Sequence, residues 1–372
     1  MSISFALPRD AQGVVTTLLS TLHGAHLNGA GIFCFLTIRD ARALRSVNHE
    51  CLEAVTAFRW NDNKTRIAGS LAAWRMSFPF ALAANVRNRT DLQDKDFEYL
   101  SGIKVLNMTG CSGITNNGLA HLAGIHTLNM RKCNNINDTG LAHITGIQWL
   151  DISECKNITD AGLAHLHGIH TLNMEKCDYI NDAGLAYLHG IHTLRMNYCY
   201  QITDVGIAHL RGIKKLDIER CNKITDIGLL YLAGIHTLYM NNCQRITAVG
   251  LSHLHGIHTL HMNYCNRITD DGLAHITGIH TLSMIYCDKI TDRGLSYLKG
   301  IHTLNMDSCR KITDLGLAYI SSVHTLDIED CIEITNIGIA NLKDLQKINM
   351  TGCNKDAITA ARLRGITVKY KK

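Results

Sequence analysis

The chain has 372 residues, of which 46% are hydrophobic and only 6% aromatic. Its 37 basic and 32 acidic side chains leave a net charge of +5 with no run of like charge, so composition points to neither nucleic acid nor an anionic membrane as a partner. Fourteen cysteines do not indicate a small disulfide-stapled secreted scaffold, because twelve of them share one regular interval in a long chain.

The stretch between Asp10 and Arg39 carries no formal charge and is the one segment that suggests a signal peptide or a membrane span. Polar residues such as Thr16, Ser20 and His23 interrupt it, and it lacks the continuous apolar run of about 20 residues that a spanning helix needs. We therefore expect no membrane association and a protein of the cytoplasm or the nucleus, where thiols stay reduced.

Residues 1–80 form the first predicted domain, because they show no period and carry the chain's two prolines, Pro8 and Pro79. An apolar stretch follows Pro8, and a second apolar series at helical spacing predicts one amphipathic helix over residues 38–60. That series consists of Ala41, Leu44, Val47, Cys51, Leu52 and Val55. Two or three short helices are expected here, with Cys51 as a core residue rather than a nucleophile.

Residues 101–356 repeat a 22-residue unit twelve times, each marked by a cysteine, and a fixed period of this length indicates a solenoid. The unit reads, with small changes, G-I-H-T-L-x-M-x-x-C-x-x-I-T-D-x-G-L-A-x-L-x. Its x-L-x-M segment predicts a strand with Leu128 and Met130 inward and Thr127 and Asn129 outward. The I-T-D-x-G-L-A-x-L segment predicts a short helix, capped by Thr or Asp and ended by a left-handed glycine such as Gly124.

Both ends of the array are predicted to be capped. Residues 81–100 form an N-terminal capping repeat, in which Ala84 precedes Leu106 by one period. Residues 357–372 form a C-terminal cap and basic tail, in which Ile366 and Val368 are expected to add a closing strand. The predicted fold is an α/β solenoid, a leucine-rich-repeat horseshoe with a parallel concave sheet and short convex helices, preceded by a small helical domain.

The first domain resembles an F-box, whose pattern opens with Leu-Pro, continues through a helix rich in Leu and Val, and then runs D-L-x-x-L-R-x-V before a tryptophan. In this chain those roles fall on Leu7, Pro8, Leu18, Leu22, Leu44, Val47 and Trp60. The resemblance implies that these residues bind a Skp-type adaptor.

The array resembles the cysteine-containing leucine-rich repeats through its copies of C-x-x-I-T-D-x-G-L. In that family, an F-box followed by such repeats is the substrate receptor of an SCF-type, cullin-based ubiquitin ligase. The resemblance implies a monomeric, non-catalytic receptor that holds an unidentified target protein on the repeats. The alternative is a leucine-rich-repeat scaffold without a ligase role.

The target site is predicted from the positions at which the twelve copies differ, since these positions are free of the folding constraint. Aromatic and basic residues gather at the outward strand positions of the middle copies and just before their cysteines, and such residues anchor many protein interfaces. Trp149 adds an aromatic ring where most copies have threonine. The predicted concave site consists of Trp149, Arg195, Tyr198, Arg220, Tyr239, His261, Tyr264, Ile285 and Tyr286.

No enzyme, metal or cofactor is expected. The I-T-D residues recur in almost every copy, whereas an active site is made once, and the sequence holds no phosphate-binding loop or H-E-x-x-H motif. Histidines such as His258, His280 and His302 share one repeat position, and a row of imidazoles does not converge as zinc ligands must. We expect these rings to stack and to lower one another's pKa.

Overall fold

The computed structural model describes residues 37–46, 49–353 and 355–370, without the side chains of residues 50 and 51. Within these residues, fourteen three-residue strands form one parallel sheet in chain order. The strands are β1 (Ala83–Asn85), β2 (Val105–Asn107), β3 (Thr127–Asn129), β4 (Trp149–Asp151), β5 (Thr171–Asn173), β6 (Thr193–Arg195), β7 (Lys215–Asp217), β8 (Thr237–Tyr239), β9 (Thr259–His261), β10 (Thr281–Ser283), β11 (Thr303–Asn305), β12 (Thr325–Asp327), β13 (Lys347–Asn349) and β14 (Thr367–Lys369).

Short helices return the chain from each strand to the next. They are α5 (Asn116–Ala120), α6 (Asp138–Leu141), α7 (Asp160–Leu163), α8 (Asp182–Leu185), α9 (Asp204–Ala208), α10 (Asp226–Leu230), α11 (Ala248–Leu251), α12 (Asp270–Leu273), α13 (Asp292–Leu295), α14 (Asp314–Tyr319), α15 (Asn336–Ala340) and α16 (Lys355–Leu363). The 3-10 helices are η2 (Asp94–Leu100), η3 (Ala142–Ile144), η4 (Ala186–Leu188) and η5 (Ser296–Leu298).

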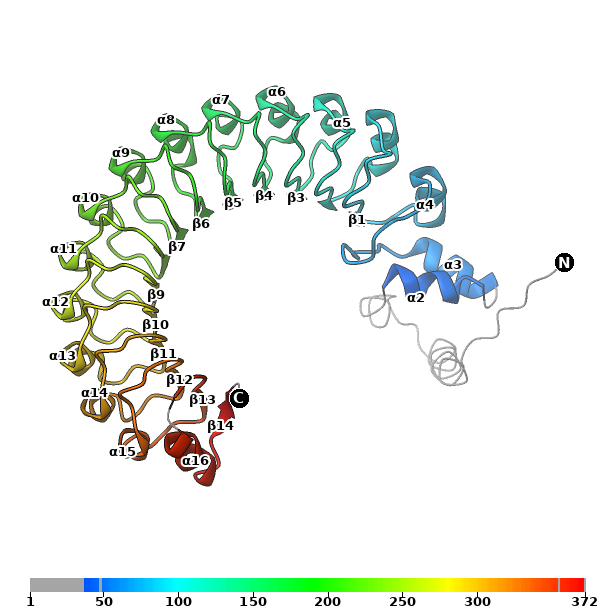
Figure 1. The fold of residues 1–372 in the computed structure, drawn as a ribbon. Coiled ribbons are helices and arrows are strands. Elements are labelled where there is room, and N and C mark those ends of the chain that lie inside the picture. The colour runs from blue at the N-terminus through cyan, green and yellow to red at the C-terminus, as the bar shows by residue number, and fades with distance from the viewer. Residues whose placement is uncertain (1–36, 47–48, 354, 371–372) are drawn as a thin grey trace.

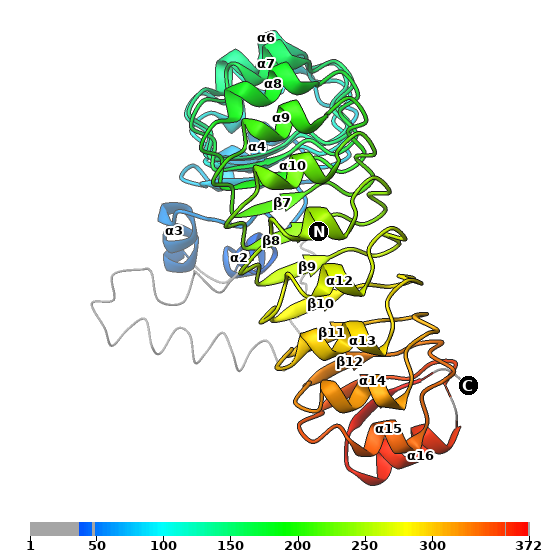
Figure 2. The ribbon, with the colours of Figure 1, turned by 90° about the vertical axis from the view of Figure 1, so that its left-hand side faces the viewer.

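The coils stack into the predicted horseshoe, with strands along the inner, concave side and helices along the outer, convex side (Figure 1). Figure 2 looks onto the convex side, where the helices follow one another in chain order. Residues one period apart pair in the sheet, as Leu238 pairs with Leu260. The horseshoe and its register are therefore confirmed.

The core is a single column of repeated apolar side chains. Leu128, Met130 and Cys133 are fully buried, as are their counterparts in the other central coils. Each repeat cysteine is a free thiol that donates to a backbone carbonyl one coil back, as the Cys155 Sγ does to the Met130 carbonyl oxygen at 3.1 Å. Burial raises the pKa of the Cys155 thiol to about 12, so these thiols stay protonated as donors.

The capping chemistry of most repeats also follows the prediction, and a further contact joins neighbouring coils. Thr159 caps α7, since its side chain accepts from the Ala161 N–H, and Gly124 adopts the left-handed φ of +74°. The Asp at the first helical position bonds forward to the next coil: Asp138 accepts from both the N–H and the hydroxyl of Thr159. The side chains of Thr and Asp thus form a ladder that ties neighbouring coils together.

The N-terminal segment departs from the prediction of one helix over residues 38–60. The chain forms two helices there, α2 (Ile38–Leu44), capped by Thr37, and α3 (His49–Ala57). A third helix, α4 (Leu71–Ser77), leads into the first strand. The helical period persists across the break between α2 and α3, so apolar spacing alone could not locate it.

Residues 60–80 behave as one further coil of the solenoid. The Trp60 carbonyl accepts from the N–H groups of Leu82 and Ala83, as the Lys104 carbonyl accepts from His126 and Thr127 two periods later. Trp74 and Phe78 are buried in the same continuous core as the repeats. Packing is therefore continuous across residue 80, where the sequence suggested a domain boundary.

The C-terminal end closes as expected. Val368 pairs with Ile348 as β14 joins β13, and Ile366 is buried beneath them. Helix α16 is longer than the repeat helices and takes the place of the usual I-T-D-x-G-L segment. Among the described residues, no helix combines the length and apolar character needed to cross a bilayer.

Candidate protein-binding surface

The residues predicted to hold a target fall into two groups. Trp149, Arg195, Tyr239 and His261 lie on strands β4, β6, β8 and β9 and face the concave side. The other five lie beyond the strands, in the turn that precedes or contains each cysteine: Tyr198, Arg220, Tyr264, Ile285 and Tyr286. The second group therefore borders the concave face instead of lying on it.

The two aromatic rings at the centre of the sheet stack on each other. The ring centroids of Tyr239 and His261 are 4.5 Å apart with an interplanar angle of 18°, and the Lys215 Nζ lies 5.6 Å from the Tyr239 centroid. Desolvation, and then the charge of Lys215, lowers the pKa of His261. His261 is therefore neutral at pH 7 and presents a flat, half-buried surface together with Tyr239.

A second cluster of aromatic and basic side chains lies in the turns. The Tyr264 and Tyr286 rings stack at 5.2 Å, and both are exposed. Tyr198 lies between two cations, with the Lys176 Nζ at 5.1 Å and the Arg220 Cζ at 5.3 Å from its ring. Such contacts hold long side chains in place before a partner arrives and so reduce the entropy lost on binding.

The backbone at these turn positions is unusual. The residue before each repeat cysteine has a positive φ, for example +63° at Tyr198, +60° at Tyr264 and +53° at Tyr286. A side chain in this conformation costs about 1–2 kcal/mol, whereas glycine, found at Gly110 and Gly352 in the first and last copies, avoids this cost. Bulky residues held in this conformation point to a use outside folding.

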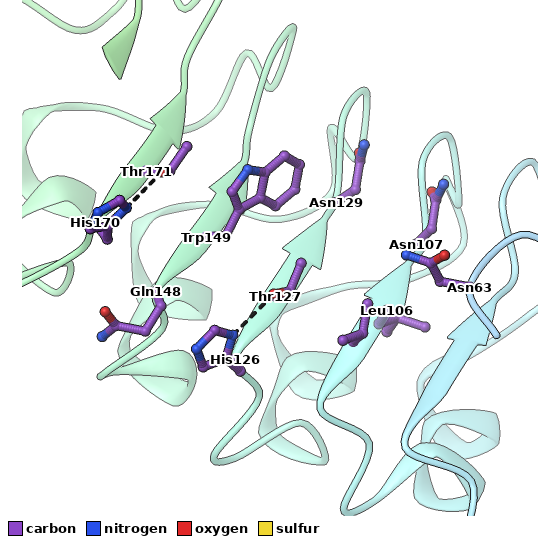
Figure 3. A pocket seen from close by; sticks show the side chains of 11 residues that line it. Asn63, Leu106, Asn107, His126, Thr127, Asn129, Gln148, Trp149, His170 and Thr171 are labelled. Carbon is purple, nitrogen blue, oxygen red and sulfur yellow. Dashed lines mark hydrogen bonds between the residues drawn. The ribbon is translucent and has the colours of Figure 1, made fainter. Parts of the chain in front are cut away.

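Trp149 lines a separate hollow near the N-terminal end of the concave face (Figure 3). The hollow has a volume of about 660 Å³ and spans strands β2 to β5. Its walls include Asn63, Val105, Asn107 and Thr171. Comparing the twelve copies with one another did not identify these residues, because Asn63 lies before the repeats and the other three are close to the common pattern. The half-buried indole projects from β4 between Thr127 and Thr171 on the neighbouring strands.

The residues assigned to adaptor binding are only partly described. Leu7, Pro8, Leu18, Leu22 and Val47 lie outside the described residues. Leu44 is half-buried against the core. Trp60 is 1% exposed, and its indole N–H donates to the Val55 carbonyl at 2.8 Å, so it supports the first coil and offers no surface to an adaptor in this conformation.

The repeated histidines stack as expected. His236, His258, His280, His302 and His324 form a continuous row with ring centroids 4.3 to 4.6 Å apart. Each of the first four contacts the following threonine hydroxyl through Nδ1, at about 3.0 to 3.1 Å. Within the described part of the chain, no group of three or more His, Cys, Asp or Glu side chains has an arrangement that could hold a metal ion.

The stacked row predicts a loss of stability in mild acid. Desolvation, and then the charges of His258, His302 and His324, lower the pKa of His280 below its usual 6.5. The unfolded chain therefore binds a proton at a higher pH than the folded chain, so stability is full above about pH 6.5 and falls as the pH drops below that value. The thermal midpoint should be lower at pH 5.5 than at pH 7.5.

The matched variant is His280→Gln, because the chain already has glutamine at this position in Gln148 and Gln346. It should reduce the difference between the two midpoints, since it removes the central imidazole of the row. Equal midpoints at pH 7.5 and pH 5.5 in the unmodified protein would contradict the prediction.

Comparison with known proteins supports the repeat architecture. A family model described as "Leucine Rich repeat" matches residues 209–233 and 253–276. No curated protein sequence shows significant similarity to the chain.

Solved structures of other proteins share the fold, among them the following three. A chain of the yeast Rad7 and Elc1 complex matches with a TM-score of 0.54 at 15% identity, over 99% of this chain and 98% of that chain. A chain of the mouse RP105/MD-1 complex matches with a TM-score of 0.60 at 12% identity, over 86% and 68%. The internalin InlF of Listeria monocytogenes matches with a TM-score of 0.50 at 21% identity, over 68% and 81%. The chain is thus a leucine-rich-repeat solenoid whose variable residues gather on the concave face and in the turns beside it.

Proposed function

We propose that the protein is a non-catalytic substrate receptor, in which the segment around residues 7–60 binds a Skp-type adaptor of a cullin ubiquitin ligase and the repeats capture a target protein. The observation that carries target capture is the series of bulky residues at left-handed positions, above all Tyr198, Tyr264 and Tyr286, where folding favours glycine. The solved complexes of Rad7 with Elc1 and of RP105 with MD-1 give precedents for partner binding by similar folds.

The alternative is a scaffold whose N-terminal helices cap the solenoid and bind no adaptor. The burial of Trp60 and the continuous packing from Trp60 to Phe78 favour it, because this part of the supposed adaptor domain is built into the first coil. The two functions share the concave site and differ only in the ligase connection.

Two pull-down experiments test the proposal: adaptor binding separates the two functions, and target capture tests the binding surface that they share. The full chain co-expressed with a Skp-type adaptor should co-purify with it, and Leu7→Ala with Pro8→Ala should abolish this. Tyr239→Ala with Tyr264→Ala should abolish target capture, whereas the matched removal of two convex rings, Tyr187→Ala with Tyr319→Ala, should leave capture intact.

The outcomes are distinct. Failure of the unmodified chain to bind any adaptor contradicts the ligase role and leaves the scaffold. Equal loss of target capture in both tyrosine pairs contradicts the assigned binding surface, whichever role the N-terminal segment has.

A further inference from the structure

The turns between each strand and the following helix bring basic side chains into a row. These residues are far apart in the sequence and form no run of consecutive charges there. Lys223, Arg245, Arg267, Lys289 and Lys311 are 22 residues apart, and each is the second residue after its cysteine. All five are exposed in the second of the two turns of their coil. Because successive strands are about 4.8 Å apart, these charges form a line of about 20 Å on one flank of the horseshoe.

Two more cations widen this row. Arg220 is exposed in the first turn of the first of the five coils and Arg310 in the second turn of the last, which completes a basic flank of Arg220, Lys223, Arg245, Arg267, Lys289, Arg310 and Lys311. Asp288 is the one exposed acidic residue in the same turns.

Two carboxylates near the row are already engaged, whereas Asp288 within it and Glu333, at the same position of the next coil, are exposed. Glu219 and Asp307, which begin the turns before Cys221 and Cys309, are half-buried and accept hydrogen bonds from Asn241 and Ser308. In the described part of the chain, none of the seven cations forms an ion pair; the Lys223 Nζ donates to the uncharged Gln201 Oε1 at 3.0 Å. Seven cations outnumber the one exposed acid of these turns, Asp288, and the resulting positive field attracts an extended anion.

Exposed aromatic rings lie within the same flank. Tyr264 and Tyr286 come from the coils that carry Arg267 and Lys289, and they stack as a pair with 41% and 39% of their surface exposed. Cations that follow a phosphate backbone, beside rings on which bases stack, are the two elements of single-stranded nucleic acid binding. An acidic protein segment would use the cations but would gain little from the ring faces.

We propose that the basic flank, together with Tyr264 and Tyr286, binds single-stranded nucleic acid through its phosphates and bases. The site extends the surface proposed to capture a target protein, with which it shares Arg220, Tyr264 and Tyr286, and it does not depend on an adaptor. Binding should be sequence-tolerant and strongly dependent on salt, because phosphate contacts release counterions and ring stacking accepts any base.

The test uses the full chain and a fluorescent single strand of about 16 nucleotides, followed by anisotropy. If five phosphates are contacted, the logarithm of the association constant should fall against the logarithm of salt concentration with a slope of about −3.5. The triple variant Arg245→Gln, Arg267→Gln, Lys289→Gln should bind at least tenfold more weakly and reduce the slope by about 2. Tyr264→Ala with Tyr286→Ala should weaken binding by about tenfold or more and leave the slope unchanged.

The control removes the same charge elsewhere, in the exposed residues Lys95, Lys214 and Lys299, each changed to glutamine. It should bind as the unmodified chain does. An equal loss in the control triple would show that net charge alone attracts the strand and would overturn the site. Poly-glutamate binding as tightly as the oligonucleotide, or a duplex of the same length binding more tightly, would overturn the assignment to single-stranded nucleic acid.

Discussion

Leu238→Ala should lower the free energy of unfolding by about 2–5 kcal/mol. Leu238 is fully buried on β8, and its register partners Leu216 and Leu260 close over it from the two neighbouring coils. Each coil of a solenoid contacts only its neighbours, so no distant part of the chain can collapse into the cavity that alanine leaves. Chemical denaturation followed by circular dichroism measures the loss.

The matched control is Tyr239→Ala on the same strand. Tyr239 faces the concave side and is half-exposed, so its removal leaves no cavity between the sheet and the helices. The control should change the free energy of unfolding by less than about 1 kcal/mol. Equal losses in the two variants would show that the Tyr239 ring belongs to the core and would weaken its assignment as a binding residue.

Asp226→Ala should cost about 1.5–3 kcal/mol, because it breaks one rung of the ladder of Asp and Thr side chains. The two Asp226 carboxylate oxygens accept from the N–H and the hydroxyl of Thr247, both at 2.7 Å. Its removal leaves the Thr247 N–H, at the start of α11, without the acceptor that a helix N-terminus needs. The same denaturation experiment measures the effect.

The next coil lacks this aspartate, so the opposite substitution, which adds one, can be tested there. Ala248 occupies the position of the aspartate, and the Thr269 side chain makes no capping hydrogen bond to α12. Ala248→Asp should therefore restore the rung and raise the free energy of unfolding by about 1 kcal/mol. A destabilising effect of Ala248→Asp would contradict the stabilising role given to the ladder.

The ladder also explains why, in most copies, the residue two positions after the aspartate is glycine. A Cβ atom built at Gly250 would lie 2.5 Å from the Asp226 Oδ1, and one at Gly184 would lie 2.4 Å from the Asp160 Oδ1. The carboxylate of the preceding coil occupies the space that any side chain would need. This glycine is thus required by contact between coils and not by its own backbone angles.

The sequence by itself determined the repeat unit, the inward positions and the register. Twelve copies of one 22-residue pattern show which residues share a position, and Leu128, Met130 and Cys133 could occupy no other environment than a shared core. The caps were equally local, since Thr159 and Gly124 act on the backbone within a few residues of themselves. The fold of a periodic chain can be predicted from its sequence because every copy shows the same pattern of inward and outward positions.

Outside the repeats, only the tertiary structure determined where the helices begin and end and which side chains are buried. Residues 38–60 have no second copy with which to align them, so their helical period concealed the break between α2 and α3. Trp60 had the position of an adaptor contact in the sequence pattern, yet packing against Phe78 and the first coil buries it. Burial depends on neighbours distant in sequence, which a local pattern cannot supply.

Surfaces that form when coils stack could also not be predicted from the linear sequence. Tyr264 and Tyr286 were correctly recognised as variable, but their place in a left-handed turn beside the sheet came from the backbone. Lys223, Arg245 and Arg267 show no charge run along the chain, because 21 residues separate each from the next. Stacking coils converts that separation into one strand spacing, and it thereby creates a charged row from residues that look scattered.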